Sequence, residues 1–279
     1  MKKLLTICFI LIHTWSLASN NDQAPWYIVQ ISDPQLGFIE KNKSIEQETI
    51  LLKKAIQKIN SLQPEILVIT GDFVNSSHNI EQIKKFKELC HLISHEILLY
   101  KVPGNHDIGN SCNKENVDFY NAQYGEDHFS ILHKGVQLIG INSCLIKNDA
   151  PQQKHQLQWL HKELKQKCKI EQRIIFGHHP FFLSNISEKE SYSNMPIKIR
   201  TIYNALFLKY HVSHYFAGHL HNNATAENNG IKYITTSALG KQLGNARSGI
   251  RIIQIKNKKI SHLSLIHISE PTRHAQISY

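Results

Sequence analysis

Ile66-Leu67-Val68-Ile69-Thr70-Gly71-Asp72 is the stretch that most directly indicates the fold of this chain. Its first five residues are almost continuously apolar and rich in β-branched side chains, which is typical of a strand covered on both faces. A glycine and then Asp72 follow, so a carboxylate lies at the end of the predicted strand. Because open α/β folds place functional residues at the carboxyl ends of their strands, Asp72 is a candidate site residue.

Four further stretches repeat this arrangement of an apolar run followed by polar side chains. The runs 27–31, 98–102, 173–176 and 212–216 lead into Asp33-Pro34-Gln35, Gly104-Asn105-His106-Asp107, Gly177-His178-His179-Pro180 and Gly218-His219-Leu220-His221. Consecutive strands bring their carboxyl ends to one edge of a sheet, so we expect these side chains to converge. Chance could supply one or two such stretches, whereas five in order indicate one shared site.

The chemistry of these side chains predicts a pair of divalent metal ions. Carboxylate and amide oxygens and imidazole nitrogens are donors that suit Mn, Fe and Zn. Hydrolysis of a phosphate ester requires neutralised phosphate oxygens and a hydroxide near neutral pH, and two ions about 3.5–4 Å apart supply both. Such a pair needs one carboxylate that bridges the ions and about three further ligands for each. The five stretches contain enough donors for this centre.

The order of the predicted elements indicates an α/β fold. Strand, helix, strand, helix and strand alternate first, and Ser44 with Gln47 predicts a capping box at the start of a helix. Antiparallel segments joined at Lys134-Gly135 and at Asn228-Asn229-Gly230 follow later in the chain. Pro151 is expected to begin another helix. Two such halves predict two mixed sheets packed face to face between helices, with residues 181–196 as a surface loop beside the site.

This constellation resembles the calcineurin-like metallophosphoesterase superfamily from about Trp26 to Ile255. The resemblance implies a four-layer αββα sandwich and a general-acid role for His106 beside the leaving group. The metal ligands that it implies are Asp33 and His221 for one ion, Asn105, His178 and His219 for the other, and Asp72 as the bridge.

Within the superfamily the first motif narrows the resemblance, because Asp33-Pro34-Gln35 replaces the commoner Asp-x-His. This start, together with 104–110, 233–244 and 249–253, is similar to the calcineurin-like phosphoesterase domain-containing proteins, which include the complete serine/threonine phosphatase. That subfamily has a single histidine where this chain has two. The resemblance therefore implies that His178 is the ligand and that His179 lies behind the ligands.

Several side chains in or near these motifs keep more than one interpretation. The amide oxygen of Gln35 can bind a metal, but it is neutral and a weaker donor than imidazole, so its ligation stays open. Asp107 is expected to fix its turn or to orient His106 rather than to bind metal. Asn142 and Ser143 also end a predicted strand, but they are not assigned to the site.

The function that follows is hydrolysis of phosphate monoesters, with phosphoserine and phosphothreonine proteins among the substrates that the resemblance implies. No candidate nucleophilic Ser or Cys falls inside the motifs, so a metal-bound hydroxide is expected to attack phosphorus. His106 would protonate the leaving oxygen. Two alternatives stay open, a phosphodiesterase acting on nucleotides or lipid head groups, and a metal-binding relative without turnover. The intact His106 argues against the latter, because a binder needs no general acid.

The N-terminus has the pattern of a signal peptide over residues 1–18. Lys2 and Lys3 precede an apolar run, and Ser16-Leu17-Ala18 supplies small residues at the cleavage positions. The run is shorter than the roughly 20 residues that span a bilayer. We therefore expect cleavage after Ala18, no stable membrane anchor afterwards, and a periplasmic or secreted protein.

Composition sets the remaining expectations for domains and partners. The mature chain predicts one domain over residues 25–263, while 264–279 resembles translated adapter sequence and is expected to be a non-native tail. The net charge of +10 falls to +8 without Lys2 and Lys3, and the lysines are scattered. This balance suits anionic substrates and does not indicate specific nucleic-acid binding. The sequence leaves open any disulfide pairing among the mature cysteines, which are Cys90, Cys112, Cys144 and Cys168.

Overall fold

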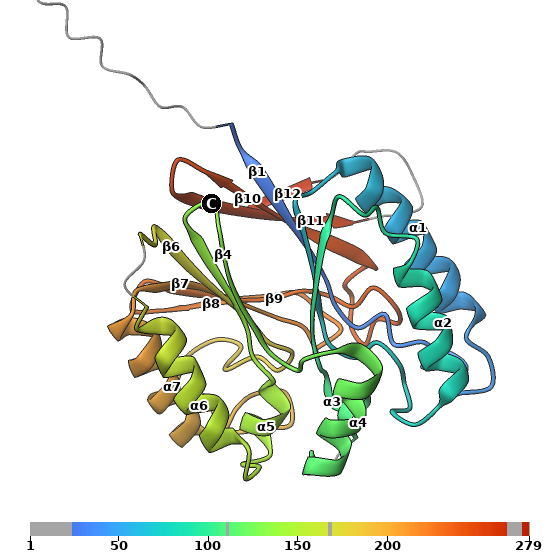
Figure 1. Ribbon diagram of the computed structural model, residues 1–279, viewed down its shortest axis with the longest axis horizontal. Coiled ribbons are helices and arrows are strands. Elements are labelled where there is room, and N and C mark those ends of the chain that lie inside the picture. Colours follow the sequence, from blue (N-terminus) through green and yellow to red (C-terminus); the bar gives the residue numbers. More distant parts are fainter. Residues whose placement is uncertain (1–23, 110–111, 167–168, 267–274, 279) are drawn as a thin grey trace, which may run out of the picture.

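The computed structural model describes residues 24–109, 112–166, 169–266 and 275–278. In this part of the chain two six-stranded mixed sheets pack face to face, and helices cover their outer faces (Figure 1). The predicted signal peptide and Cys168 lie outside the described residues. Cys90, Cys112 and Cys144 are free thiols. None of the described helices is long and apolar enough to cross a membrane.

The first sheet has the strand order β12-β11-β10-β1-β2-β3. Strands β1, β2 and β3 run parallel, and the later strands extend this sheet in antiparallel pairs. The helices α1 and α2 lie along its outer face (Figure 1). The bounds are Trp26–Ile31 for β1, Ile66–Thr70 for β2, Leu98–Val102 for β3, Gly249–Lys256 for β10, Lys259–Ile266 for β11, Ala275–Ser278 for β12, Glu46–Leu62 for α1 and Ile80–Cys90 for α2.

The second sheet has the order β4-β5-β6-β7-β9-β8, with β5, β6, β7 and β9 parallel. The helices α6 and α7 pack on its outer face (Figure 1). The short helices α3 and α5 follow the ends of β3 and β5, and α4 follows α3 and packs into the apolar cluster beside the first sheet. The strands are Phe129–His133 (β4), Val136–Gly140 (β5), Gln172–Phe176 (β6), Val212–Ala217 (β7), Ala224–Asn228 (β8) and Ile231–Thr235 (β9). The helices are Asn105–Ile108 (α3), Lys114–Tyr124 (α4), Ser143–Lys147 (α5), Gln153–Leu164 (α6) and Ile197–Lys209 (α7).

Three layers of apolar side chains hold the four layers of backbone together. In β2 alternate residues face opposite ways, so Val68 packs between the sheets against Phe176 and Phe216, while Leu67 packs outward with the residues of α1. This alternation explains why the β2 sequence is apolar throughout. The predicted αββα sandwich is confirmed.

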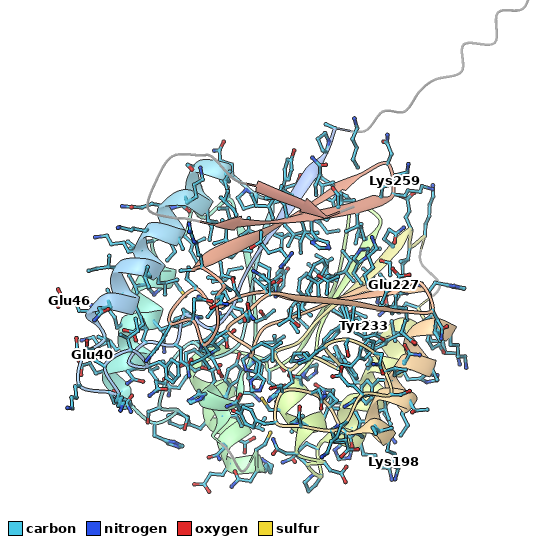
Figure 2. The ribbon with its side chains drawn as sticks, turned by 180° about the vertical axis from the view of Figure 1, so that it is seen from behind. Glu40, Glu46, Lys198, Glu227, Tyr233 and Lys259 are labelled. Carbon is cyan, nitrogen blue, oxygen red and sulfur yellow. The ribbon has the colours of Figure 1, made fainter. Side chains whose placement is uncertain are left out.

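Charged side chains lie around the outside of the sandwich. Figure 2 shows Glu46, Lys198, Glu227 and Lys259 pointing outward from different elements, whereas Tyr233 lies inside and is buried. Side chains of both charges therefore lie on the outside of the sandwich.

Two local predictions were wrong, and one stays untested. Ser44 and Gln47 form no capping box, because the N-cap of α1 is Ile45, which places Ser44 before the cap and Gln47 at the second helical position. The helix after Pro151 begins at Gln153. Strand β11 continues into the first residues of the segment predicted to be a non-native tail, and β12 pairs with it. The origin of that segment stays a prediction.

Candidate metal centre

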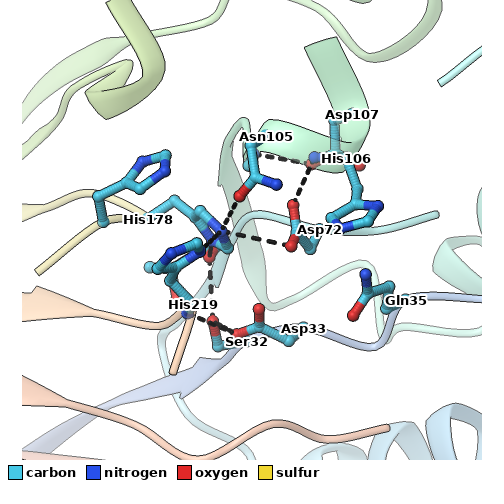
Figure 3. A network of polar contacts seen from close by, with 12 residues as sticks. Ser32, Asp33, Gln35, Asp72, Asn105, His106, Asp107, His178 and His219 are labelled. Atoms are coloured by element: carbon cyan, nitrogen blue, oxygen red, sulfur yellow. Dashed lines mark hydrogen bonds and ion pairs between the residues drawn. The ribbon is translucent and has the colours of Figure 1, made fainter. Parts of the chain in front are cut away.

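The seven predicted ligands come together at the carboxyl ends of strands from both sheets. Figure 3 labels all of them except His221. Each is buried, and together they follow β1, β2, β3, β6 and β7. The ligands are Asp33 and Gln35 after β1, Asp72 after β2, Asn105 after β3, His178 after β6, and His219 and His221 after β7.

The backbone at these strand ends adopts conformations that side chains rarely favour. Asp33, Gln35, Asp72, His219 and His221 all have positive φ, between 41° and 73°. Such residues cost on the order of 1–3 kcal/mol each and concentrate at functional sites. This concentration favours a functional role over the simpler reading of each residue as a turn former.

Glycine residues allow the turns to approach one another closely. A Cβ on Gly104 would lie 2.1 Å from Asp72 Oδ1, and one on Gly218 would lie 1.7 Å from Ser32 Oγ and 2.6 Å from Asp33 Oδ2. Neither position accepts a side chain without moving a carboxylate that faces the site. The glycines in these two motifs therefore serve close packing around the site.

One group of donor atoms surrounds His178. Its Nε2 lies 3.2 Å from Asn105 Oδ1, 3.2 Å from His219 Nδ1 and 3.4 Å from Asp72 Oδ2. Its Nδ1 donates to Thr70 O at 2.9 Å. The Nε2 lone pair is then available to a metal ion bound among these atoms. These four side chains make one candidate metal site.

A second group contains Asp33, Asp72 and His221, which offer ligand atoms within 4.8 Å of one another. His221 Nε2 lies 3.4 Å from Asp33 Oδ1, and His221 Nδ1 donates to Lys241 O. Gln35 lies beside the two carboxylates (Figure 3) and donates its Nε2 to Asn75 Oδ1 at 3.3 Å. This hydrogen bond uses the amide nitrogen and leaves Gln35 Oε1 as the atom that can bind a metal.

The donor atoms of the second group fit a divalent cation. Among the described residues, buried Gln35 Oε1 has no hydrogen-bond partner and buried Asp33 Oδ1 has only the 3.4 Å contact with His221 Nε2, although buried polar atoms are normally paired. Two carboxylates buried this close together also require positive charge nearby. Asp72 belongs to this group and also faces His178, so a single carboxylate connects the two candidate sites.

The electrostatics of the site agree with this reading. Burial alone would raise the pKa of Asp72, but His178 beside it outweighs burial and lowers the pKa well below its usual range. Burial would likewise lower the pKa of His178, yet Asp72 and Asp33 raise it to about 10. The carboxylates therefore make a strongly negative environment that favours cations.

Asp107 accepts hydrogen bonds from backbone amides of its own turn and of the turn after β2, and it does not face the ligand atoms. Its Oδ2 accepts from Gly104 N at 2.8 Å, and its Oδ1 accepts from Phe73 N at 2.7 Å and Val74 N at 3.3 Å. These bonds join the turns after β2 and β3. Burial and the neighbouring Asp72 raise the pKa of Asp107 well above its usual range.

His179 lies near enough to His178 and His219 to join the metal ligands by distance, yet its hydrogen bonds indicate another role. Ser143 Oγ accepts from His178 N at 3.0 Å and His179 N at 2.9 Å, so its own proton is left for His179 Nδ1 at 3.1 Å. Burial, followed by the charges of His219 and His178, lowers the pKa of His179 well below its usual range. A neutral ring that accepts at Nδ1 is protonated at Nε2. His179 therefore has no free lone pair for a metal, although its ring lies close to the ligands.

His106 lies at the edge of the site, where a cleft of about 490 Å³ opens. Its backbone N donates to Asp72 Oδ1 at 2.9 Å, and its Nδ1 donates to Asn75 O at 2.9 Å. The ring is therefore held with Nε2 as its free nitrogen. Residues that line the cleft are Asn105, His106, Lys147, Asn148, His179 and Tyr192.

The structure adds residues that sequence reasoning missed. Ser32 Oγ lies beside Asp33 Oδ2, Ser143 holds both histidines after β6, and Tyr192 contacts Asn105 and His219 from the loop before α7. Ser143 stood at a predicted strand end, which was a usable signal. No pattern in the loop sequence singles out Tyr192.

Comparison with known proteins identifies the family. The profile of the calcineurin-like phosphoesterases matches residues 27–223, which include every predicted ligand. The chain belongs to this family. This calcineurin-like phosphoesterase is 31% identical over 269 residues to the serine/threonine-protein phosphatase CPPED1 of Danio rerio, covering 88% of this chain and 87% of the relative. The Homo sapiens protein of that name is 31% identical over 271 residues, covering 89% and 86%.

Solved structures share its fold at low sequence identity. A dimetal phosphatase from Danio rerio aligns with a TM-score of 0.62 and 12% identity over 83% of this chain and 95% of that one. A purple acid phosphatase from yellow lupin (Lupinus luteus) aligns with a TM-score of 0.67 and 15% identity over 91% of this chain, but over only 53% of its own length. The family and the fold together make this chain a metal-dependent phosphoesterase.

Proposed function

We propose that this calcineurin-like phosphoesterase hydrolyses phosphate monoesters, with phosphoserine and phosphothreonine side chains of proteins as its substrate class. The observation that carries the proposal is the position of Asp72. This buried carboxylate belongs to both groups of metal-binding atoms, as a centre for two ions requires. The relatives named serine/threonine-protein phosphatase, which align over most of the chain, support the choice of substrate.

The buried side chains fit two divalent ions, of Mn, Fe, Zn or Mg, and would divide between them. Bound there, the ions supply neutralisation of the phosphate oxygens and a lowered pKa for water. The protein holds the donors ready, because hydrogen bonds to Thr70 O and Lys241 O fix two of the imidazoles. The residues assigned to one ion are Asp33, Gln35 and His221, those assigned to the other are Asn105, His178 and His219, and Asp72 serves both.

His106 supplies the proton that the leaving oxygen needs. Asn75 O holds Nδ1, so Nε2 is the atom from which a protonated ring passes its proton to the departing alkoxide. The backbone bond from His106 N to Asp72 Oδ1 keeps the ring beside the bridging carboxylate. The cleft that His106 lines has room for the alcohol side of the ester.

Metal reconstitution tests the proposal. The chelator-treated protein receives Mn, Fe, Zn or Mg and is assayed against a nitrophenyl phosphate monoester, the matching diester and a phosphoserine peptide. We expect metal-dependent release from the monoester and the peptide, and almost none from Asp72→Asn. Asp118→Asn is the matched control, because Asp118 is exposed and pairs with Lys114 on the surface of α4.

The diester distinguishes the alternative enzyme. Faster release from the diester than from both monoesters would replace the proposed phosphatase with a phosphodiesterase. Two bound ions without turnover of any ester would instead favour a metal-binding relative.

We also propose that the protein is exported after removal of residues 1–18. Lys2, Lys3 and the small residues before Ser19 support this proposal. N-terminal sequencing of protein from the extracytoplasmic fraction is expected to begin at Ser19, and an intact Met1 there would contradict the proposal.

A further inference from the structure

The segment between β6 and α7 brings one aromatic residue to two predicted ligands of the same ion. Tyr192 Oη lies 3.4 Å from Asn105 Nδ2, and the Tyr192 ring lies 4.8 Å from the His219 ring, centroid to centroid. The side chain also lines the cleft beside His106, and Tyr192 remains 70% exposed. Tyr192 thus lies between solvent and the Asn105–His178–His219 group.

The contact with Asn105 determines which end of the amide faces the other donors. A carboxamide has an oxygen and a nitrogen of nearly equal size, and only the oxygen can bind a cation. Asn105 directs Oδ1 toward His178 Nε2 and Nδ2 toward the Tyr192 hydroxyl, which can accept its hydrogen bond. Without this acceptor, the amide loses one of the two contacts that distinguish its orientations, and only the contact of Oδ1 with His178 Nε2 is left.

The partly buried Glu188 carboxylate and the buried Arg200 guanidinium hold the backbone of this segment. The Glu188 carboxylate accepts from Leu183 N at 2.9 Å, Ser184 N at 2.8 Å and Asn194 Nδ2 at 2.7 Å. Arg200, which is fully buried, donates to three carbonyl oxygens of the segment, at Ile186, Glu188 and Met195.

Lys147 ties the tip of the segment to α5. Its Nζ donates to Ser191 O at 2.7 Å and to Asn194 O, on either side of Tyr192. The hydroxyl is therefore presented by a fixed backbone, and ordering it on metal binding requires little further loss of entropy.

We propose that Tyr192 is a positioning residue for the ion site of Asn105, His178 and His219. It fixes the Asn105 amide with its oxygen inward and covers the His219 ring, so the loop 181–196 completes a site whose ligands all lie on other segments. The inference rests on the metal centre of the proposed function and adds a residue that determines the affinity of one of its two ions.

The test is metal binding by the full chain without substrate. Calorimetric titration of chelator-treated protein with Mn²⁺ compares the wild type with Tyr192→Phe, which keeps the ring but removes the hydroxyl. Loss of a hydrogen bond that orients a ligand typically costs about 10–100-fold in metal affinity, so we expect that loss for one ion and an unchanged affinity for the other. Tyr192→Ala should weaken the same ion further, because it also uncovers His219.

Tyr210→Phe is the matched control, because it removes a tyrosine hydroxyl that lies 3.0 Å from His161 Nε2 at the end of α7. We expect this variant to bind both ions like the wild type. Equal affinities for Tyr192→Phe and the wild type would overturn the positioning role. So would an equal loss for both ions with a lower melting temperature of the metal-free protein, since that result describes a damaged fold.

The outcomes separate this inference from the proposed function. A selective loss of one ion in Tyr192→Phe, with no ester hydrolysed by the wild type, would support the positioning role and contradict the phosphatase. Hydrolysis by the wild type, with unchanged metal binding in Tyr192→Phe, would support the phosphatase and contradict the positioning role.

Discussion

Gln35 is the residue at which this chain departs from the commoner histidine of its superfamily. Its Oε1 is buried without a hydrogen-bond partner, while Asn75 Oδ1 accepts from its Nε2. An amide is a weaker donor than an imidazole, so we expect this site to favour Mn or Mg over Zn. Gln35→His should tighten the site by roughly 10-fold and shift its preference toward Zn or Fe. Activity titrated with each metal after chelator treatment measures the change.

Asn75→Ala is the companion variant, because it removes the acceptor that orients the Gln35 amide but leaves Oε1 in place. It should weaken metal binding without changing which metal is preferred. Identical titration curves for the wild type and Gln35→His would mean that Gln35 is not a ligand.

The role proposed for His106 is protonation of the leaving group, not metal binding. His106→Ala should keep both ions and lower kcat by about 10²–10⁴-fold for alkyl phosphates, whose alkoxides need a proton. Nitrophenolate leaves without much protonation, so the nitrophenyl ester should lose much less. The comparison of the two substrates is the measurement. An equal loss on both would contradict the general-acid role.

Among the elements, the strands were predictable because their side chains carry the signal locally. The runs at β1, β2, β6 and β7 are mostly apolar because sheets or helices cover both faces, whereas the edge strand β3 is partly exposed. In all five, the polar site residues follow the run directly in sequence. The loop before α7 was predicted only as a loop. The Tyr192–Asn105 contact joins residues 87 positions apart, and periodicity does not report such a contact.

The capping box was wrong because of the position at which the helix begins. Ser44 and Gln47 have the right spacing, but Ile45 is the N-cap, so neither residue occupies the position that a capping box requires. Short motifs with local alternatives are therefore weaker predictors than strand ends that recur five times.

The loop before α7 should depend on the charge of Glu188. Burial alone would raise the pKa of Glu188, but its hydrogen-bond donors outweigh burial and lower the pKa to about 2. A carboxylate with a lowered folded-state pKa stabilises the fold above its unfolded pKa of about 4.5, and this contribution disappears as the pH falls toward 2. We expect Glu188→Gln to lose amide-exchange protection in residues 183–196 at pH 7.

Ser187→Ala, at an exposed position in the same loop, is the control and should exchange like the wild type. The wild-type loop should itself lose protection between about pH 4.5 and 2. Unchanged protection in Glu188→Gln would show that Arg200 and Lys147 hold the loop without the carboxylate.

At the scale of the whole molecule, acid stability should depend on a histidine buried between the sheets. Burial, followed by the charge of His262, lowers the pKa of His214 to about 3, and no described residue forms a hydrogen bond with His214 Nε2. The unfolded chain then binds more protons below about pH 6.5, so the free energy of unfolding falls as the pH decreases from there toward 3.

Between pH 8 and pH 5, His214 should lower the free energy of unfolding by about 1–2 kcal/mol, because only the unfolded chain takes up its proton. His214→Gln cannot take up this proton, so its unfolding free energy should change less between these pH values. Urea unfolding of metal-free wild type and variant at both pH values measures the difference. Equal pH dependence would mean that His214 is solvated in the folded protein.

The two groups of donor atoms that share Asp72 would hold one ion each, and anomalous X-ray diffraction from a manganese-loaded crystal tests this arrangement. We predict two anomalous peaks that flank the Asp72 carboxylate, one beside Asp33, Gln35 and His221, the other beside Asn105, His178 and His219. A single peak, or two peaks that do not share Asp72, would contradict the account.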